Sequence, residues 1–204
     1  MKLYDSLGPN PRIVRMFLAE KGIDLPKQTV DVRKGENREP EHLKRNPHGQ
    51  MPTLELDDGS YLSEIIPICE YLEEKNPTPA LIGSTPEERA ECRMWTRRVD
   101  LNICEPLANG FRFAEGLKMF ETRIPVVPEA APGLKKIAAN RLQWLNSQMA
   151  DGRQYLCGKR FTLADIHLFG WLDFGGKIGQ PLDPANTHVA AWLARVGERP
   201  SVAA

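Results

Sequence analysis

The fold is decided by the stretch Gln50-Met51-Pro52-Thr53-Leu54-Glu55-Leu56-Asp57-Asp58-Gly59-Ser60-Tyr61-Leu62-Ser63-Glu64-Ile65. Leu54 and Leu56 alternate with Glu55, which is the period of a half-buried strand. Residues 57–60 have turn chemistry, so a second short strand should pair with the first as a hairpin. Apolar residues at helical spacing follow, and we expect Ser63 to be the N-cap of that helix and Glu64 to lie in its first turn.

The same stretch carries groups that suit a peptide-like ligand. Pro52 enters a strand, and a cis bond before it would turn the backbone groups of Met51 outward, free for pairing. Glu64 places a carboxylate beside the free N–H groups of a helix N-terminus, which suits a ligand with an adjacent ammonium and carboxylate. A hairpin followed by an ordinary helix start is the alternative, and these residues alone leave both open.

The residues before this stretch predict a small mixed sheet. Residues 2–6 and 28–32 are expected strands, and Pro11 should begin a helix between them, with Asn10 as N-cap and Gly22 as C-cap. The order β-α-β-α-β-β-α gives one parallel pair through the crossover and an antiparallel pair through the hairpin. This is a thioredoxin-like α/β arrangement. The loop over residues 7–11 holds no cysteine, so thiol chemistry would need a thiol supplied by the ligand.

The second half of the chain is predicted to be all-helical. Pro77, Pro79 and Gly83 indicate a linker, residues 78–84, between a domain over residues 1–77 and another over residues 85–204. Thr85 should cap the first helix of the second domain, and Pro106 should kink or end it. Thr162 with Asp165 three residues later predicts a capped, buried helix. The expected fold class is a thioredoxin-like α/β domain followed by an all-α domain.

Composition narrows the possible partners and compartments. The chain has 204 residues with 27 Lys and Arg against 27 Asp and Glu, which argues against nucleic acid or an anionic membrane as a partner. No apolar run of about 18 residues and no signal-peptide pattern is found. The four cysteines form no CxxC motif, as expected of reduced thiols in a cytoplasmic protein. His42 and His48 lack a partnering cysteine pair, so no metal site is expected.

A family resemblance rests on Asn46-Pro47-His48-Gly49-Gln50-Met51-Pro52-Thr53-Leu54, Asp57-Asp58-Gly59 and Leu62-Ser63-Glu64-Ile65. These segments resemble the glutathione-site signature of soluble, bacterial-like glutathione S-transferases, and the resemblance covers nearly the whole chain. It implies a cis proline, pairing of Met51 with the cysteinyl backbone of glutathione, and a bond from Glu64 to the γ-glutamyl amine. It also implies that Gln50 and Asn37 bind the glycyl and neighbouring groups. Most members have serine where this chain has Ile65, which offers only its backbone N–H.

The group that would stabilise the glutathione thiolate also departs from the family pattern. A free cysteine thiol has a pKa of about 8.5, so a donor must favour the thiolate at neutral pH. Many members use Tyr, Ser or Cys in the loop after the first strand, but Gly8 stands at that place here. The loop resembles subfamilies in which an asparagine follows a proline, so Asn10 is the first candidate and Ser6 the second. A plain N-cap is the alternative role of Asn10.

The resemblance places the electrophile pocket between the two halves of the chain. Candidate lining residues are Leu7, Phe111, Phe113 and Trp171, although aromatics at helical spacing also suit a core. The implied function is a cytoplasmic, homodimeric detoxifying transferase that uses glutathione as co-substrate, needs no metal and conjugates a small hydrophobic electrophile. Two alternatives stay open. One is a glutathione-dependent disulfide reductase or peroxidase, and the other is a non-catalytic binding module.

Overall fold

The chain forms two compact units in the computed structural model, which describes residues 1–204. The first unit comprises Met1–Ser84 together with Pro200–Ala204, and the second comprises Thr85–Arg199. The break falls at the end of the predicted linker, residues 78–84. The last five residues cluster with the first unit, whereas the predicted helical domain extends to residue 204.

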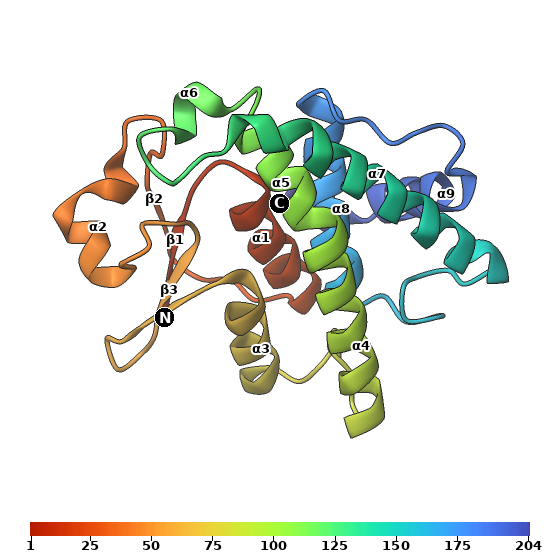
Figure 1. The fold of residues 1–204 in the computed structure, drawn as a ribbon. Coiled ribbons are helices and arrows are strands. Elements are labelled where there is room, and N and C mark those ends of the chain that lie inside the picture. The colour runs from red at the N-terminus through yellow and green to blue at the C-terminus, as the bar shows by residue number, and fades with distance from the viewer. The chain divides into compact units, whose positions relative to one another are not determined.

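The first unit contains a four-stranded mixed sheet in the order β2-β1-β3-β4 (Figure 1). Its strands are β1 (Lys2–Asp5), β2 (Lys27–Thr29), β3 (Thr53–Glu55) and β4 (Tyr61–Ser63). β1 is parallel to β2 and β3 is antiparallel to β4, as predicted from the crossover and the hairpin. β1 also pairs antiparallel with β3, which the sequence analysis did not predict. The strand predicted over residues 28–32 is shorter in the structure. The Asp31 carboxylate accepts the N–H of Arg33 and of Lys34, which starts a turn there.

Helices cover both faces of this sheet (Figure 1). They are α1 (Pro9–Lys21), α2 (Pro40–Arg45) and α3 (Ile65–Lys75), with short 3₁₀ turns at Glu36–Arg38 and Pro200–Ala203. α1 and α3 lie on one face, where the buried side chains include Leu3, Phe17 and Leu72. On the face toward α2, Tyr4 packs edge-on to the buried His42 ring, and burial lowers the pKa of His42. His42 is therefore neutral at pH 7 and adds no charge to this face.

Two helix starts differ from the prediction. α1 begins at Pro9 with Gly8 as N-cap at φ 114°, so Asn10 is the second helical residue and not the N-cap. The N-cap of α3 is Glu64 at φ 71°, because Ser63 is held in β4 opposite Thr53. Neither N-cap residue makes a side-chain hydrogen bond to its helix, so both helix starts leave N–H groups open.

The second unit is helical, and its only strand-like features are two isolated bridges in residues 155–160. Its α-helices are α4 (Pro86–Val99), α5 (Glu105–Arg112), α6 (Leu117–Phe120), α7 (Ala131–Gln148), α8 (Leu163–Lys177) and α9 (Thr187–Gly197). Short 3₁₀ turns at Pro128–Ala130 and Met149–Asp151 begin and end α7. The predicted caps are confirmed: Thr85 accepts the N–H of Glu88, and Thr162 and Asp165 form a capping box.

A wide π-helical turn, Asp100–Cys104, separates α4 from α5. Pro106, the second residue of α5, has no N–H, and its ring would clash with the carbonyl four residues earlier in a regular α-helix. The wider turn removes this conflict, so the predicted interruption at Pro106 is confirmed in the form of a π-turn.

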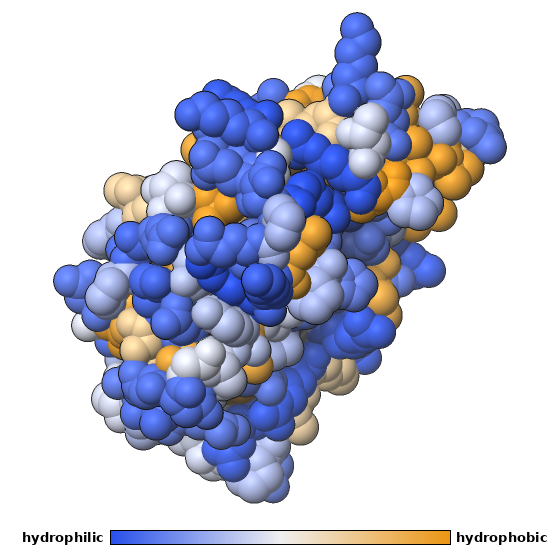
Figure 2. All heavy atoms as spheres, turned by 90° about the vertical axis from the view of Figure 1, so that its left-hand side faces the viewer, coloured by the Kyte–Doolittle hydropathy of each residue, from blue (hydrophilic) through white to orange (hydrophobic).

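Hydrophilic side chains predominate on the face of the molecule in Figure 2, and apolar side chains form separate patches among them. No helix has the length and the apolar character that crossing a membrane requires.

Candidate active site

The start of α1 is a helix N-terminus with an unusual supply of hydrogen-bond donors. Pro9 and Pro11 occupy the first and third helical positions and have no N–H, so Asn10 carries the only main-chain donor of these three residues. The side-chain oxygen of Asn10 is buried and has no hydrogen-bond partner. At the positive end of the helix dipole, Asn10 is therefore the one residue of these three that can offer an anion a main-chain N–H.

Ser6, the second candidate for thiolate stabilisation, is already hydrogen-bonded. Its hydroxyl donates to the carbonyl oxygen of Val30 at 2.6 Å, and the residue is 5% exposed. Because a serine hydroxyl has one hydrogen, this bond would have to break before Ser6 could donate to a thiolate. Leu7, the next residue, has 61% of its surface exposed.

Buried amides hold the loop before β3 in place. Asn37 Nδ2 donates to the carbonyl oxygen of Gly49 at 2.6 Å, and Asn46 Nδ2 donates to that of Gln50 at 2.9 Å. Gly49 has φ 59°, and a Cβ there would lie 2.8 Å from the carbonyl oxygen of Asn37. Only glycine therefore fits at this close approach of two backbone segments.

The Met51–Pro52 peptide bond is cis, the geometry implied by the resemblance. The backbone N–H and C=O of Met51 take part in none of the hydrogen bonds of the sheet or of the loops beside it. These two groups are therefore available to another extended chain.

The start of α3 offers both a negative charge and free donors. Glu64 is exposed and has the only positive φ of a non-glycine residue in the chain. The N–H groups of Ile65 and Ile66, the first two helical residues, have no acceptor within the chain. The side chain of Ile65 is 8% exposed, so this residue can offer a ligand only its N–H.

The sheet register brings these three places together. Tyr4 in β1 lies opposite Thr53 in β3, and Thr53 lies opposite Ser63 in β4. Ser6 and Met51 are each two residues beyond their pair, and Glu64 directly follows β4, so all lie at the same end of the sheet. Neighbouring strands are about 4.8 Å apart, so this end spans about 10 Å across three strands.

Three aromatic rings meet in the second unit. The ring of Phe174 is 5.4 Å from that of Phe111 and 6.0 Å from that of Trp171, each edge to face. Phe111 also contacts Phe120 at 6.1 Å. The structure thus joins two of the predicted pocket residues through Phe174, which the sequence analysis missed although it follows Trp171 at helical spacing. Phe113 is half-buried beside this cluster in sequence. The pocket itself stays a prediction.

No group of three or more His, Cys, Asp or Glu side chains is placed to hold a metal ion. All four cysteines are free and buried.

Comparison with known proteins finds two family profiles along the chain. The profile described as the N-terminal domain of glutathione S-transferase matches residues 8–75, and that of the C-terminal domain matches residues 116–200. The chain is 32% identical to glutathione S-transferase 2 of Saccharomyces cerevisiae, over 99% of this chain and 88% of that protein. It is 30% identical to glutathione S-transferase GstA of Escherichia coli O157:H7, over 99% and 95%. A crystal structure of a glutathione S-transferase domain-containing protein from Marinobacter aquaeolei matches with a TM-score of 0.93 and 35% identity, over 99% of this chain and 100% of that one.

Proposed function

Because the chain belongs to the glutathione S-transferase family, we propose that it binds glutathione across the end of its sheet and conjugates it to a small hydrophobic electrophile. An extended tripeptide is about 10 Å long, which matches the distance from the start of α1 to the start of α3 across β1, β3 and β4. This shared sheet end, set by the register, is the observation that carries the proposal.

The γ-glutamyl end of glutathione is assigned to the start of α3. The Glu64 carboxylate pairs with the ammonium, and the open N–H groups of Ile65 and Ile66 receive the carboxylate. Because Ile65 has no hydroxyl, the γ-glutamyl carboxylate of glutathione receives one hydrogen bond fewer than it would from a serine at this position. We therefore expect weaker glutathione binding than in relatives with serine at this position.

The middle and the glycyl end are assigned to the loop before β3. Met51 pairs its free N–H and C=O with the cysteinyl backbone, as strand addition does. Gln50 lies beside it and is half-exposed, within reach of the glycyl group. Asn37 contributes by fixing Gly49, because its buried amide donates to the Gly49 carbonyl.

Thiolate stabilisation is assigned to Asn10. Its main-chain N–H and its side-chain amide are not used elsewhere in the first turn of α1. One charge-assisted hydrogen bond is worth about 1.5–3 kcal/mol, enough to lower a thiol pKa by about 1–2 units. That shift turns a thiol of pKa about 8.5 into one that is largely ionised near neutral pH.

The chemical step is a direct attack by the thiolate on the electrophile. The sulfur forms a bond to an electrophilic carbon, and the leaving group departs with the electron pair of its bond. No enzyme-bound covalent intermediate is needed, because glutathione brings the nucleophile. The aromatic cluster of Phe111, Trp171 and Phe174 is the proposed apolar surface for the electrophile. We also propose a cytoplasmic homodimer that acts in detoxification, as the family resemblance implies.

A glutathione-dependent disulfide reductase or peroxidase is the second candidate. It is favoured by one observation: the usual hydroxyl donor is missing, since Gly8 has no side chain and Ser6 donates to Val30. An amide donor supports a thiolate for either reaction, and the relative rates of conjugation and reduction distinguish the two.

Steady-state rates with three substrates test the proposal. These are 1-chloro-2,4-dinitrobenzene, 2-hydroxyethyl disulfide and cumene hydroperoxide, each with glutathione. We expect conjugation of the aryl halide to be the fastest reaction, with a rate that rises with the thiolate fraction. Faster reduction of the disulfide or the hydroperoxide would select the second candidate. If none of the three reactions proceeds and glutathione does not bind, the chain is a non-catalytic module.

A further inference from the structure

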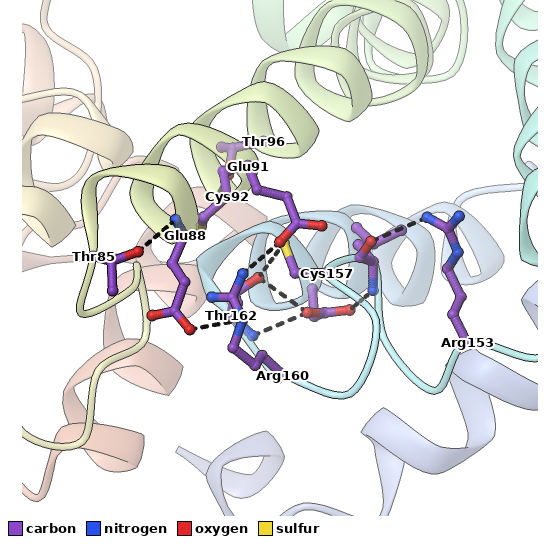
Figure 3. A network of polar contacts seen from close by, with 11 residues as sticks. Thr85, Glu88, Glu91, Cys92, Thr96, Arg153, Cys157, Arg160 and Thr162 are labelled. Atoms are coloured by element: carbon purple, nitrogen blue, oxygen red, sulfur yellow. Dashed lines mark hydrogen bonds and ion pairs between the residues drawn. The ribbon is translucent and has the colours of Figure 1, made fainter.

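Two of the four cysteines meet in the second unit (Figure 3). Cys92 lies on α4, and Cys157 lies in the loop before α8; each thiol has the largest single influence on the pKa of the other. They are 1% and 4% exposed. The other two, Cys69 and Cys104, lie in apolar core, where burial raises the pKa of each thiol well above its usual value.

Hydroxyl groups lie close to both sulfurs. Thr96 Oγ1 lies 3.9 Å from Cys92 Sγ and donates its hydrogen to the Cys92 carbonyl oxygen at 2.8 Å. Thr162 Oγ1 lies 3.6 Å from Cys157 Sγ and 3.2 Å from Asp165 Oδ2, and either atom can accept its hydrogen. The N–H of Ala164, at the start of α8, also reaches the Cys92 sulfur. Polar groups and a helix N-terminus beside a thiol favour its ionised form, in contrast to the apolar surroundings of Cys69 and Cys104.

The two thiols differ in acidity as a result. Donation from Cys157, helped by Thr162, Ala164 and Thr96, lowers the pKa of Cys92 to about 7 despite its burial. The same neighbour, together with burial, raises the pKa of Cys157. The pair thus loses its first proton more easily than its second, and Arg153 and the buried Asp165 are the charged groups that face Cys157.

Ion pairs fasten the loop that carries Cys157 to α4 (Figure 3). Arg160 pairs with Glu91 and, at 3.6 Å, with Glu88. The guanidinium of Arg153 lies 5.1 Å from the centre of the Trp95 ring. Both anchors are partly exposed and are therefore weak, whereas Leu156 in the same loop is buried and donates its N–H to Asp165. An oxidant reaches the buried thiols only when this segment opens locally.

We propose that Cys92 and Cys157 form a redox-sensitive pair in which a small hydroperoxide oxidises Cys92 and Cys157 then closes an intramolecular disulfide. The Cys92 thiolate attacks the hydroxyl oxygen of the peroxide, and the O–O bond breaks. Cys92 becomes a sulfenic acid, and the other oxygen leaves with the electron pair and takes a proton to form water or an alcohol. The Cys157 sulfur then attacks the Cys92 sulfur. The hydroxyl leaves with the Cys157 proton as water, so the two thiols lose two electrons and the peroxide gains them.

The disulfide would have a structural consequence within the second unit. It would close a loop of about 65 residues and tie α4 covalently to the segment before α8. We expect the Tm of the oxidised protein to rise by roughly 5–10 °C, and the rise to disappear on reduction with dithiothreitol.

Mass spectrometry of the whole chain after hydrogen peroxide treatment tests the pair. We expect a mass loss of about 2 Da, loss of two of the four titratable thiols, and a peptide in which Cys92 is linked to Cys157. Cys157→Ser should give no disulfide. Instead, Cys92 should gain about 16 Da and react with dimedone. Cys69→Ser is the matched control and should still form the disulfide.

Three results would overturn the proposal. One is a full set of free thiols in the wild-type chain after peroxide has oxidised an equal concentration of free cysteine. Another is a stable sulfenic acid on wild-type Cys92 with no disulfide. The third is a linkage that involves Cys69 or Cys104. If Cys157→Ser fails to fold, Cys157→Ala serves in its place, and the wild-type result decides in either case.

Discussion

Gly8 decides how α1 begins. Its φ of 114° and ψ of 172° belong to a region that is essentially restricted to glycine, although a Cβ there would meet no atom within 4 Å. There is thus space for a side chain at residue 8, but the backbone conformation there suits only glycine. In the proposed function, Asn10, two residues further on, binds the thiolate instead.

The first prediction concerns this glycine. We expect Gly8→Ala to lower the free energy of unfolding by about 1–3 kcal/mol, because alanine must either adopt a strained φ or move the start of α1. Urea unfolding measures the change. Gly133→Ala is the matched control, because its Cβ also meets nothing within 4 Å but its backbone is helical. The control should be neutral or stabilising by up to about 1 kcal/mol. Equal effects of the two substitutions would show that φ is not the cause.

At residue scale, the signature alone suffices to propose Glu64, Met51 and Gln50 as site residues, and these roles stay predictions. The local conformation is harder to predict. The predicted N-cap roles of Asn10 and Ser63 are wrong. Pro9 and Pro11 both suit the first turn of a helix, and the helix begins at Pro9. Ser63 lies in β4, where it pairs with Thr53. Strand register is a long-range property, so a local cap preference does not reveal it.

Among the elements, α1, α3 and the linker are joined by one buried ion pair. Lys21 Nζ donates to Glu73 Oε2 at 2.7 Å and to the Pro79 carbonyl at 2.6 Å, and Glu73 Oε1 accepts the N–H of Ile82 at 2.9 Å. Both side chains are nearly inaccessible. The pair therefore fixes residues 79–82 against the two helices of the first unit.

The second prediction follows from this burial. Lys21→Met should lower the free energy of unfolding by about 3–5 kcal/mol, because it leaves the Glu73 carboxylate buried without its cation. Lys177→Met is the control, since Lys177 pairs with Asp173 on an exposed face of α8. That change should cost no more than about 0.5 kcal/mol. Chemical denaturation of both variants checks the difference, and a loss for Lys21→Met as small as the control's would contradict it.

Asp165 caps α8 from a fully buried position. Its carboxylate accepts hydrogen bonds from the N–H groups of Leu156 and Thr162 and from Trp192 Nε1. Burial nevertheless raises the pKa of this carboxyl to about 6. A carboxyl whose pKa is higher in the folded state than in the unfolded state binds a proton more tightly in the folded state. Its contribution to stability therefore grows as the pH falls from about 6 toward 4.

The third prediction uses Asp165→Asn, which removes this titration. We expect the variant to be less stable than wild type at pH 7, because the amide cannot accept from all the donors. The gap should widen by up to about 3 kcal/mol between pH 6 and pH 4, since about 2 pKa units correspond to that energy. Urea unfolding at several pH values measures the gap. A gap that narrows as the pH falls would contradict a raised pKa.

On the scale of the whole molecule, the chain returns to its first unit at the C-terminus. Arg12 Nη2 donates to the Val202 carbonyl at 3.0 Å, and the Ser201 hydroxyl donates to Glu20 at 2.6 Å. The tail therefore fastens both ends of one face of α1. The sequence predicted the two-part architecture and the end of the linker, but not this return. Pro200 predicts only that α9 ends before it, because the sequence of residues 200–204 does not indicate which part of the fold they contact.

The fourth prediction removes the tail. Deletion of residues 200–204 should lower the free energy of local unfolding of α1 by about 2 kcal/mol, because two hydrogen bonds and a buried serine are lost. Native-state hydrogen exchange should then be roughly 30-fold faster in α1 and unchanged in α8. Deletion of Ala204 alone is the control, since that residue is exposed. Faster exchange confined to the second unit would contradict the assignment of the tail to the first.

The central claim is that Asn10 stabilises the glutathione thiolate, and ultraviolet titration of bound glutathione tests it most directly. Thiolate absorbance against pH should give a bound thiol pKa at least about 1 unit below that of free glutathione. In Asn10→Ala, which keeps the main-chain N–H, the pKa should rise by about 1 unit, the value of one charge-assisted hydrogen bond. A lowered pKa that is the same in the variant would contradict the claim and return the role to Ser6 or to the backbone.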